Sequence, residues 1–179
     1  MHGVFGLAYL LMFIYLPREM ALQIVFVLLT LGILIALIHH RHKIPYLDDL
    51  IDKFERTDES RIVGEAAIKF TFGILISALV FFVLGLDNRV ILGAIVTLAL
   101  GDSTSTIIGK MFGKTKIFRN KSLEGTIAGI VVSAVAMMAF LPALVAIPAA
   151  IAGMLSELIP LNDNYTIPLV TGVTIALLL

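Results

Sequence analysis

Acidic, hydroxyl and basic side chains gather in three short segments of a chain of 179 residues that is otherwise strongly apolar. The first segment begins GDSTSTIIGK. If this segment is helical, one face carries Asp102, Ser105, Thr106, Gly109 and Gly113. A stripe of carboxylate and hydroxyl groups in an apolar helix usually faces a site or a polar cavity. The alternative is structural, with Asp102 bonded to a Ser or Thr hydroxyl so that two helices are locked together.

The second segment, KSLEGTIAG, combines a helix start with positive charge. Ser122 is a good N-cap for the helix that follows, and Glu124 lies in its first turn. A capping box would place the acid at Gly125, so that motif does not explain Glu124. The free N–H groups of a helix start attract phosphate, and Lys121 stands immediately before them. Further basic residues nearby are Lys114, Lys116 and Arg119. Together these groups form a basic surface suited to a triphosphate.

The third segment, ELIPLNDNYTIP, places Asp163 between two asparagines. In a soluble protein this is ordinary turn chemistry. Here we expect the turn to meet the first two segments at one membrane face, where Asp163 adds a carboxylate. Oxygen ligands of this kind hold Mg²⁺. The three segments therefore contain the parts of a phosphoryl or nucleotidyl transfer site.

The stretch GKMFGKT nearly spells a Walker A phosphate-binding loop. The template GxxxxGK[ST] requires a glycine at the position of Ile108, and Gly109 comes one residue too late. A Walker A loop must also follow a buried strand in an α/β domain. The composition of the chain leaves no room for such a domain.

This composition indicates an integral membrane protein. Hydrophobic residues make up 59% of the chain and charged residues only 15%, whereas soluble domains are about half apolar and about a quarter charged. Cysteine is absent, which excludes disulfides and Cys-ligated metal sites. We predict an all-α, polytopic membrane helix bundle that forms a single domain over residues 1–179, with about seven spans. The predicted spans are Val4–Leu16, Ala21–Ile38, Glu65–Leu86, Val90–Ile108, Gly125–Leu141, Leu144–Ile159 and Thr166–Leu179.

Lysine and arginine gather in two loops, at residues 39–64 and 110–121, which the positive-inside rule places in the cytoplasm. Alternation of the spans then puts the amino terminus and the turn at 162–164 inside, and the carboxyl terminus outside. The first apolar segment has no basic region before it and no small-residue cleavage site, so we expect a retained span rather than a signal peptide. The loop at 39–64 also predicts a cytoplasmic amphipathic helix at the membrane interface, from apolar residues at helical spacing. These residues are Leu47, Leu50, Ile51 and Phe54.

Taken together, the motifs resemble the CTP-dependent polyprenol kinase family, which includes dolichol, phytol and farnesol kinases and a CTP-dependent diacylglycerol kinase. The family pattern is an Asp followed by small residues, then G-x-x-x-G, then K-S-x-E-G-T, and later an Asp-Asn with a Pro shortly after. In this chain the pattern falls on Asp102, Gly109 with Gly113, residues 121–126, and Asp163-Asn164 with Pro168. The resemblance covers roughly the second half of the chain.

The resemblance implies an enzyme that transfers the γ-phosphate of CTP to a lipid alcohol of the polyprenol or dolichol type, at the cytoplasmic membrane face, with Mg²⁺ or else Mn²⁺ or Ca²⁺. The expected catalytic residues are Asp102, Lys121 and Glu124. Asp102 and Asp163 are expected to bind the metal, with Glu124 as a third ligand or as the base. Expected partners are CTP, the lipid alcohol and the bilayer, without nucleic acid, and a homo-oligomer stays open. The residues expected to bind CTP are Ser105, Gly109, Gly113, Lys114, Lys116, Arg119, Ser122, Gly125, Thr126 and Asn164.

Two other functions stay open at this stage. Phosphatidate cytidylyltransferases and CDP-archaeol synthases, which make CDP-lipids from CTP, are more distantly similar, but their His-Gly-Gly and Asp-Arg elements are absent here. A transporter or scaffold would show paired repeats and charges near mid-membrane on several spans, whereas Asp102 is the one clear intramembrane carboxylate. Structural roles also stay open, because Gly125 and Gly129 match the helix-packing motif GxxxG and the lysines satisfy the positive-inside rule.

Overall fold

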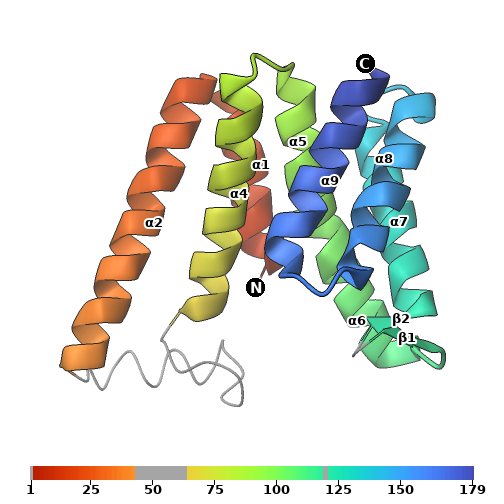
Figure 1. The fold of residues 1–179 in the computed structure, drawn as a ribbon, viewed down its shortest axis with the longest axis horizontal. Helices are drawn as coiled ribbons and strands as arrows, with labels where there is room; N and C mark the ends of the chain where they lie inside the picture. Colours follow the sequence, from red (N-terminus) through yellow and green to blue (C-terminus); the bar gives the residue numbers. More distant parts are fainter. Residues whose placement is uncertain (1, 43–63, 119–120) are drawn as a thin grey trace.

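The computed structural model of the protein describes residues 2–42, 64–118 and 121–179. The predicted amphipathic helix at 47–54 and the predicted CTP ligand Arg119 lie outside the described residues. The described part is all-helical apart from one short two-stranded hairpin (Figure 1). In chain order the elements are α1 His2–Tyr15, α2 Arg18–Arg41, α4 Glu65–Val83, α5 Asn88–Val96, a π-helical turn Thr97–Gly101, α6 Asp102–Phe112, β1 Lys116–Phe118, β2 Lys121–Ser122, α7 Leu123–Met137, α8 Ala143–Leu155, a 3₁₀ turn Ser156–Leu158 and α9 Asp163–Leu178.

Three helical stretches in the described part are long and apolar enough to cross a membrane. They are Arg18–Arg41, Glu65–Val83 and Asn88–Phe112, the last of which joins α5, the π-helical turn and α6. These stretches coincide with the second, third and fourth predicted spans. The apolar helices Gly3–Tyr15, Leu123–Met137 and Ala143–Leu158 are shorter. The structure therefore agrees with an all-helical membrane protein.

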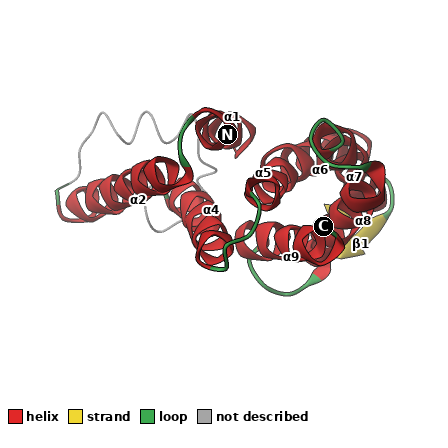
Figure 2. Ribbon diagram, turned by 90° about the horizontal axis from the view of Figure 1, so that it is seen from above, coloured by secondary structure: helices red, strands yellow, loops and turns green. Residues whose placement is uncertain are grey.

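The helices from α5 to α9 form one closed group around the apolar core (Figure 2). Helices α1 and α4 pack beside α5, and α2 lies outermost against α4. Most of the α2 surface stays exposed and carries large apolar side chains such as Phe26, Leu31 and Leu37. An apolar surface of this size is suited to lipid contact, because lipid tails are as apolar as the leucine side chain.

One end of the bundle is closed by tight, well-capped turns. Gly85 adopts a left-handed backbone with φ of 66°, and the N–H of Leu86 bonds to the Phe81 carbonyl at 3.0 Å, as at many helix ends. Asp87 then caps α5 by accepting a backbone N–H two residues on, at 2.8 Å. The Arg18 guanidinium donates to the Leu86 carbonyl at 2.6 Å, which ties the start of α2 to this turn. The hairpin and the α8–α9 connection lie at the opposite end (Figure 1).

The π-helical turn rotates the side chains of α6 about the axis of the long helical stretch Asn88–Phe112. Here the N–H of Asp102 bonds to the Thr97 carbonyl, five residues back instead of four. One extra residue in a turn rotates the following residues by about 100° relative to a continuous α-helix. Beyond the turn, Asp102 and Ser105 are both buried. The turn therefore sets which face of α6 meets the rest of the bundle.

Helices α6 and α7 approach closely because glycines lie where they meet. A Cβ atom on Gly125 would overlap the Ser105 carbonyl oxygen, and a Cβ on Gly109 would lie 2.9 Å from the Ser122 Oγ. A Cβ on Gly113 would lie 2.6 Å from the same hydroxyl. Small residues at membrane helix contacts allow such approach. The packing alternative for Gly125 therefore has direct support in the structure.

We predict that Gly73→Ala destabilises the protein, because a Cβ at this position of α4 would overlap the Asn164 carbonyl oxygen at the start of α9. Overpacking of this kind costs about 1–3 kcal/mol. Gly32→Ala is the matched control, since the new Cβ on α2 would meet only Ile68, at 3.6 Å. Alanine also favours the helix over glycine by up to about 1 kcal/mol. Melting temperatures of fluorescent-protein fusions, followed by size-exclusion chromatography in detergent, should fall for Gly73→Ala and hold or rise for Gly32→Ala. An equal loss in both variants would contradict the packing.

Candidate functional site

The site is built around the Lys121 ammonium, which contacts three carboxylates. Its Nζ lies 2.9 Å from Asp102 Oδ1, 3.3 Å from Glu157 Oε2 and 3.5 Å from Asp163 Oδ2. Lys121 belongs to β2, Asp102 begins α6, Glu157 lies in the 3₁₀ turn after α8, and Asp163 begins α9. We call these four residues the Lys121 cluster. The structure thus brings together the three polar segments singled out in the sequence.

The carboxylates of the Lys121 cluster differ strongly in exposure. The side chain of Glu157 is 0% exposed, that of Asp102 is 10% exposed and that of Asp163 is 37% exposed. Burial alone would lower the pKa of Lys121, but attraction to Asp102, Glu157 and Asp163 raises it above the usual lysine value. The three carboxylates therefore favour the charged form of Lys121.

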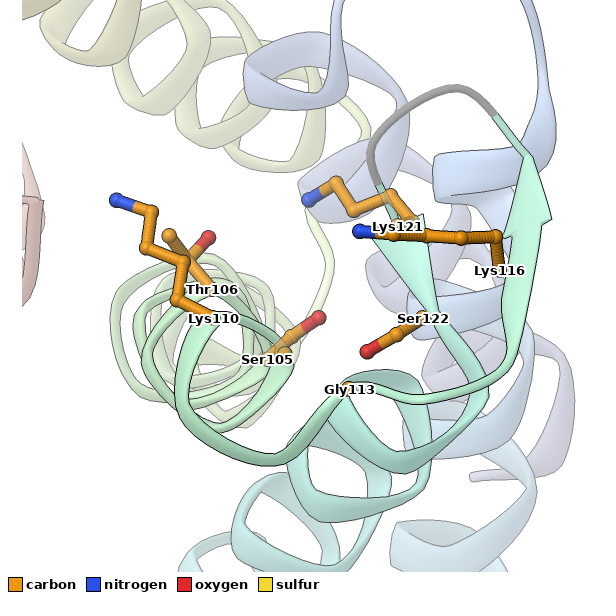
Figure 3. A pocket seen from close by; sticks show the side chains of 8 residues that line it. Ser105, Thr106, Lys110, Gly113, Lys116, Lys121 and Ser122 are labelled. Atoms are coloured by element: carbon orange, nitrogen blue, oxygen red, sulfur yellow. The ribbon is translucent and has the colours of Figure 1, made fainter.

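A cleft of about 440 Å³ opens in front of Lys121, between α6 and the hairpin. Figure 3 shows the side chains of Lys116 and Lys121 extending from the hairpin in the same direction, with Thr106 and Lys110 on the α6 side. The hydroxyl groups of Ser105 and Ser122 face each other across the base of the cleft. The lining residues are Ser105, Thr106, Gly109, Lys110, Gly113, Lys116, Lys121 and Ser122. Lysine and hydroxyl donors on two walls are suited to an anionic ligand such as a phosphate group.

The local sequence explains how the hairpin holds its lysines. Strands β1 and β2 pair antiparallel, with Lys116 opposite Ser122. The N–H of Leu123 bonds to the Thr115 carbonyl at 2.9 Å, which closes the hairpin onto the start of α7. Ser122 accepts the Gly125 N–H at 3.2 Å, so the prediction that Ser122 is an N-cap is confirmed. The same serine therefore ends β2, caps α7 and lines the cleft.

Glu124, expected as base or metal ligand, has a different contact in the structure. Its carboxylate oxygens accept the Thr115 N–H at 3.1 and 3.3 Å. It makes no ion pair with Lys121, whose partners are the three carboxylates of the cluster. Glu124 therefore fastens the loop before β1 to the first turn of α7. Its expected role as base or metal ligand stays a prediction, and its carboxylate faces the loop rather than Lys121.

The residues expected to bind CTP divide into two groups. Those that line the cleft are Ser105, Gly109, Gly113, Lys116 and Ser122. Lys114 is exposed outside the lining, Gly125 and Thr126 are buried in the α6–α7 contact region, and Asn164 packs against Gly73 of α4. For this second group CTP binding stays a prediction, and membership of the motif does not fix which side of a helix faces the cleft.

Two residues of the site, Glu157 and Lys110, were not expected as site residues from the sequence, whereas Thr106 belongs to the predicted polar face. Glu157 is a single carboxylate at the end of the long apolar run before Pro160. An ionisable residue inside or at the end of an apolar segment is a functional candidate in its own right. That rule would have identified Glu157. Thr106 and Lys110 follow the helical spacing from Asp102 toward the cleft mouth.

The arrangement does not fit a resident divalent metal. Within the three described stretches, no group of three or more His, Cys, Asp or Glu side chains is placed to hold a metal ion. Asp102 and Asp163, two of the expected metal ligands, together with Glu157 surround the Lys121 ammonium instead. The third expected ligand, Glu124, is bonded to a backbone amide. The central position that a cation would occupy is taken by the side chain of Lys121.

Comparison with known proteins gives one significant similarity. The chain is 28% identical over 175 residues to an uncharacterized protein, MJ1137, of Methanocaldococcus jannaschii, and the match covers 96% of this chain and 87% of that protein. No protein-family model matches the chain, and no solved structure matches it. The similarity to MJ1137 therefore extends over the amino-terminal helices as well as over the segments that form the Lys121 cluster.

We predict that Lys121→Ala destabilises the protein more than Lys116→Ala. Removing Lys121 leaves the fully buried Glu157 carboxylate without its cation, and an unsatisfied buried polar group costs about 1–3 kcal/mol. Lys116 lines the same cleft but is exposed, so its loss changes little. The melting temperatures of the two variants in one detergent provide the measurement. Equal melting temperatures would show that the Lys121 ion pairs contribute nothing to stability.

Proposed function

We propose that this protein is a membrane enzyme that transfers the γ-phosphate of CTP to the hydroxyl group of a lipid alcohol. The observation that carries the proposal is the cleft itself. A partly buried lysine, held between carboxylates, lies at its inner end, and hydroxyls and two exposed lysines line its walls. Phosphoryl transfer depends mainly on positioning the phosphate and neutralising its charge, and these groups are suited to that task.

The position of the cleft supports a lipid acceptor. Its walls, α6 and the hairpin, lie at one end of a bundle of apolar helices (Figure 1). A hydroxyl group at the headgroup level of the bilayer would therefore lie near the cleft mouth while its apolar chain stays in the membrane. The proposal includes about seven spans, with the cleft on the cytoplasmic side, because the basic residues around it follow the positive-inside rule.

In the proposed reaction the lipid hydroxyl oxygen forms a bond to the γ-phosphorus of CTP. The bond from the γ-phosphorus to the bridging oxygen breaks, and CDP leaves with the electron pair. Lys121 contacts the transferring phosphate, while Lys110 and Lys116 hold the remaining phosphates at the cleft mouth. Asp102 takes the hydroxyl proton, because it lies on the same helix as the cleft-lining hydroxyls and is more accessible than Glu157. No step is assigned to a resident metal, and Mg²⁺ enters this proposal only as the counter-ion that accompanies CTP in solution.

The first prediction concerns the fate of the two ends of CTP. We expect label at the γ-phosphate, but not at the α-phosphate, to enter the lipid fraction when purified protein in lipid is given Mg²⁺ and a lipid alcohol. Dolichol, geranylgeraniol and diacylglycerol are the alcohols to compare, with phosphatidate and unsaturated archaetidic acid as acidic lipids. Transfer of α-label to an acidic lipid would replace the kinase by a cytidylyltransferase that makes a CDP-lipid. Movement of neither label would overturn the enzymatic proposal and favour a transporter or scaffold.

A second prediction concerns Asp102→Asn. This change keeps the shape of the side chain but removes the proposed proton acceptor, so we expect the transfer rate to fall by about 10²-fold or more. Glu157 and Asp163 still hold Lys121, so the melting temperature should change little. Asp87→Asn is the control, because asparagine caps a helix as well as aspartate does and this exposed residue lies at the other end of the bundle. Equal activity in the two variants would exclude Asp102 as the base.

A further inference from the structure

Glu157 is mounted on a short, firmly bonded turn. Helix α8 ends at Leu155, and the Ser156 hydroxyl donates to the Gly153 carbonyl at 2.6 Å. The N–H of Ile159 then bonds to the Ser156 carbonyl at 3.1 Å. These bonds fix the backbone on both sides of Glu157. Its side chain is directed inward toward β2 and α6, where it meets Lys121 and Ser105.

The carboxylate of Glu157 is completely buried but only half bonded. Oε2 lies 3.3 Å from Lys121 Nζ and accepts the Ser105 hydroxyl at 3.5 Å. Oε1 is buried and has no hydrogen-bond partner within the described residues. Burying a carboxylate costs several kcal/mol of free energy even when it is paired, and an apolar side chain would fill the same place at lower cost. A purely structural role therefore gives no reason for an acid at this position.

The three carboxylates around Lys121 differ in how strongly solvent screens their attraction to the ammonium. Asp163 is the most exposed of the three, with 37% of its side chain exposed, so water and salt screen its attraction to the ammonium. Asp102 is 10% exposed, and Glu157 is fully buried at the inner end. An anionic ligand that enters the cleft competes with the accessible carboxylates for Lys121, whereas the Glu157 contact lies behind the ammonium. Glu157 therefore keeps its contact with Lys121 when the ligand replaces the contacts of Asp102 and Asp163.

We propose that Glu157 is a positioning residue that holds the Lys121 ammonium from behind, so that it stays at the inner end of the cleft when a phosphate group binds. This inference rests on the proposed function for its phosphate ligand, but the contact between Glu157 and Lys121 does not. The role is distinct from that of a base, because Glu157 acts through Lys121 and is not itself accessible from the cleft. It also differs from the role expected for Glu124, whose carboxylate is bonded to the loop.

The charged groups around Lys121 control the protonation of its amine, and this protonation can be followed by chemical labelling. The acidic ones are Asp102 from α6, Glu157 from the 3₁₀ turn and Asp163 from α9, and the basic ones in the same cleft are Lys110 from α6 and Lys116 from β1. The acids hold the Lys121 pKa above its usual value, so the amine is almost entirely protonated at neutral pH. Only the unprotonated amine reacts with an acylating reagent. Loss of the least screened carboxylate therefore exposes Lys121 to chemical labelling.

The experiment is competitive labelling of the full-length protein in detergent with acetic anhydride between pH 8 and 10, read for each lysine by mass spectrometry. In Glu157→Gln we expect Lys121 to react at least about tenfold faster than in the wild type, which corresponds to about one pKa unit. Lys116 is the internal reference and should not change. Glu124→Gln and Glu65→Gln are matched controls, because Glu124 contacts Thr115 and Glu65 pairs with Lys69. Unchanged labelling of Lys121 in Glu157→Gln, or an equal increase in Glu124→Gln, overturns the proposal.

A second variant keeps the test decisive if Glu157→Gln does not fold. Ser105→Ala leaves every charge in place and removes only the hydroxyl that bonds to Glu157 Oε2. Acetylation of Lys121 should then be faster than in the wild type. The increase should be smaller than in Glu157→Gln, because the charge of Glu157 is still present. No change in Lys121 labelling in this variant would count against a Glu157 carboxylate that is held in place behind Lys121.

The transfer assay separates a failure of this inference from a failure of the proposed function. If CTP serves as donor, Glu157→Gln should lower kcat by about tenfold or more while the KM for CTP changes little, because Lys110 and Lys116 still bind the nucleotide. If the wild type transfers no label, the proposed function is wrong, yet the labelling difference at Lys121 still tests Glu157. A normal kcat in Glu157→Gln, with faster Lys121 labelling, would show that the contact exists but does not position the lysine for transfer.

Discussion

The ammonium group of Lys121 lies within ion-pair distance of acids from α6, from the turn after α8 and from the start of α9. These elements are far apart in the sequence, and Lys121 itself is carried by a hairpin strand of two residues. A charge at this depth is tolerated only when it is paired, so the lysine and its acids constrain one another. The ends of three helical segments are thereby fixed around a single cation. The constraint also fixes the two walls of the cleft relative to each other, because Asp102 belongs to α6 and Lys121 to the hairpin.

Close packing of α6 against α7 is the second condition for the cleft. Glycines at 109, 113 and 125 let the Ser122 hydroxyl and the Ser105 carbonyl approach the neighbouring backbone. A larger side chain at any of these positions would push the two helices apart and move Ser105 away from Ser122. The motif G-x-x-x-G thus contributes to the site by allowing α6 to lie close to α7 rather than by contacting a ligand. Binding residues and packing residues are interleaved along the same few turns of helix.

Much of this arrangement could be predicted from the sequence, and the part that could not has a physical reason. Composition and apolar runs identified the helical membrane class, and the spacing from Asp102 to Gly113 identified one helix face correctly, because all these residues follow the π-helical turn. Ser122 was recognisable as a cap from local chemistry alone. Glu157 was not selected, because nothing in its own segment shows that the 3₁₀ turn directs it toward a lysine 36 positions earlier. The resemblance implies a catalytic role for Glu124, whereas the orientation of its side chain depends on a loop that the motif does not describe. Tertiary contacts determine the side-chain orientations of Glu157 and Glu124.

The charges of the cleft sum to zero but are not mixed. Asp102, Glu157 and Asp163 contribute three formal negative charges, and Lys121, Lys110 and Lys116 contribute three positive ones. The acids surround the Lys121 ammonium, whereas Lys110 and Lys116 make no ion pair with these acids and are exposed. The two exposed lysines therefore form a positive region beside a cluster in which three acids outnumber one lysine. An anionic ligand would be attracted by Lys110 and Lys116 before its terminal phosphate reaches Lys121. Direction of entry, and not only affinity, is thus determined by where the lysines and acids lie.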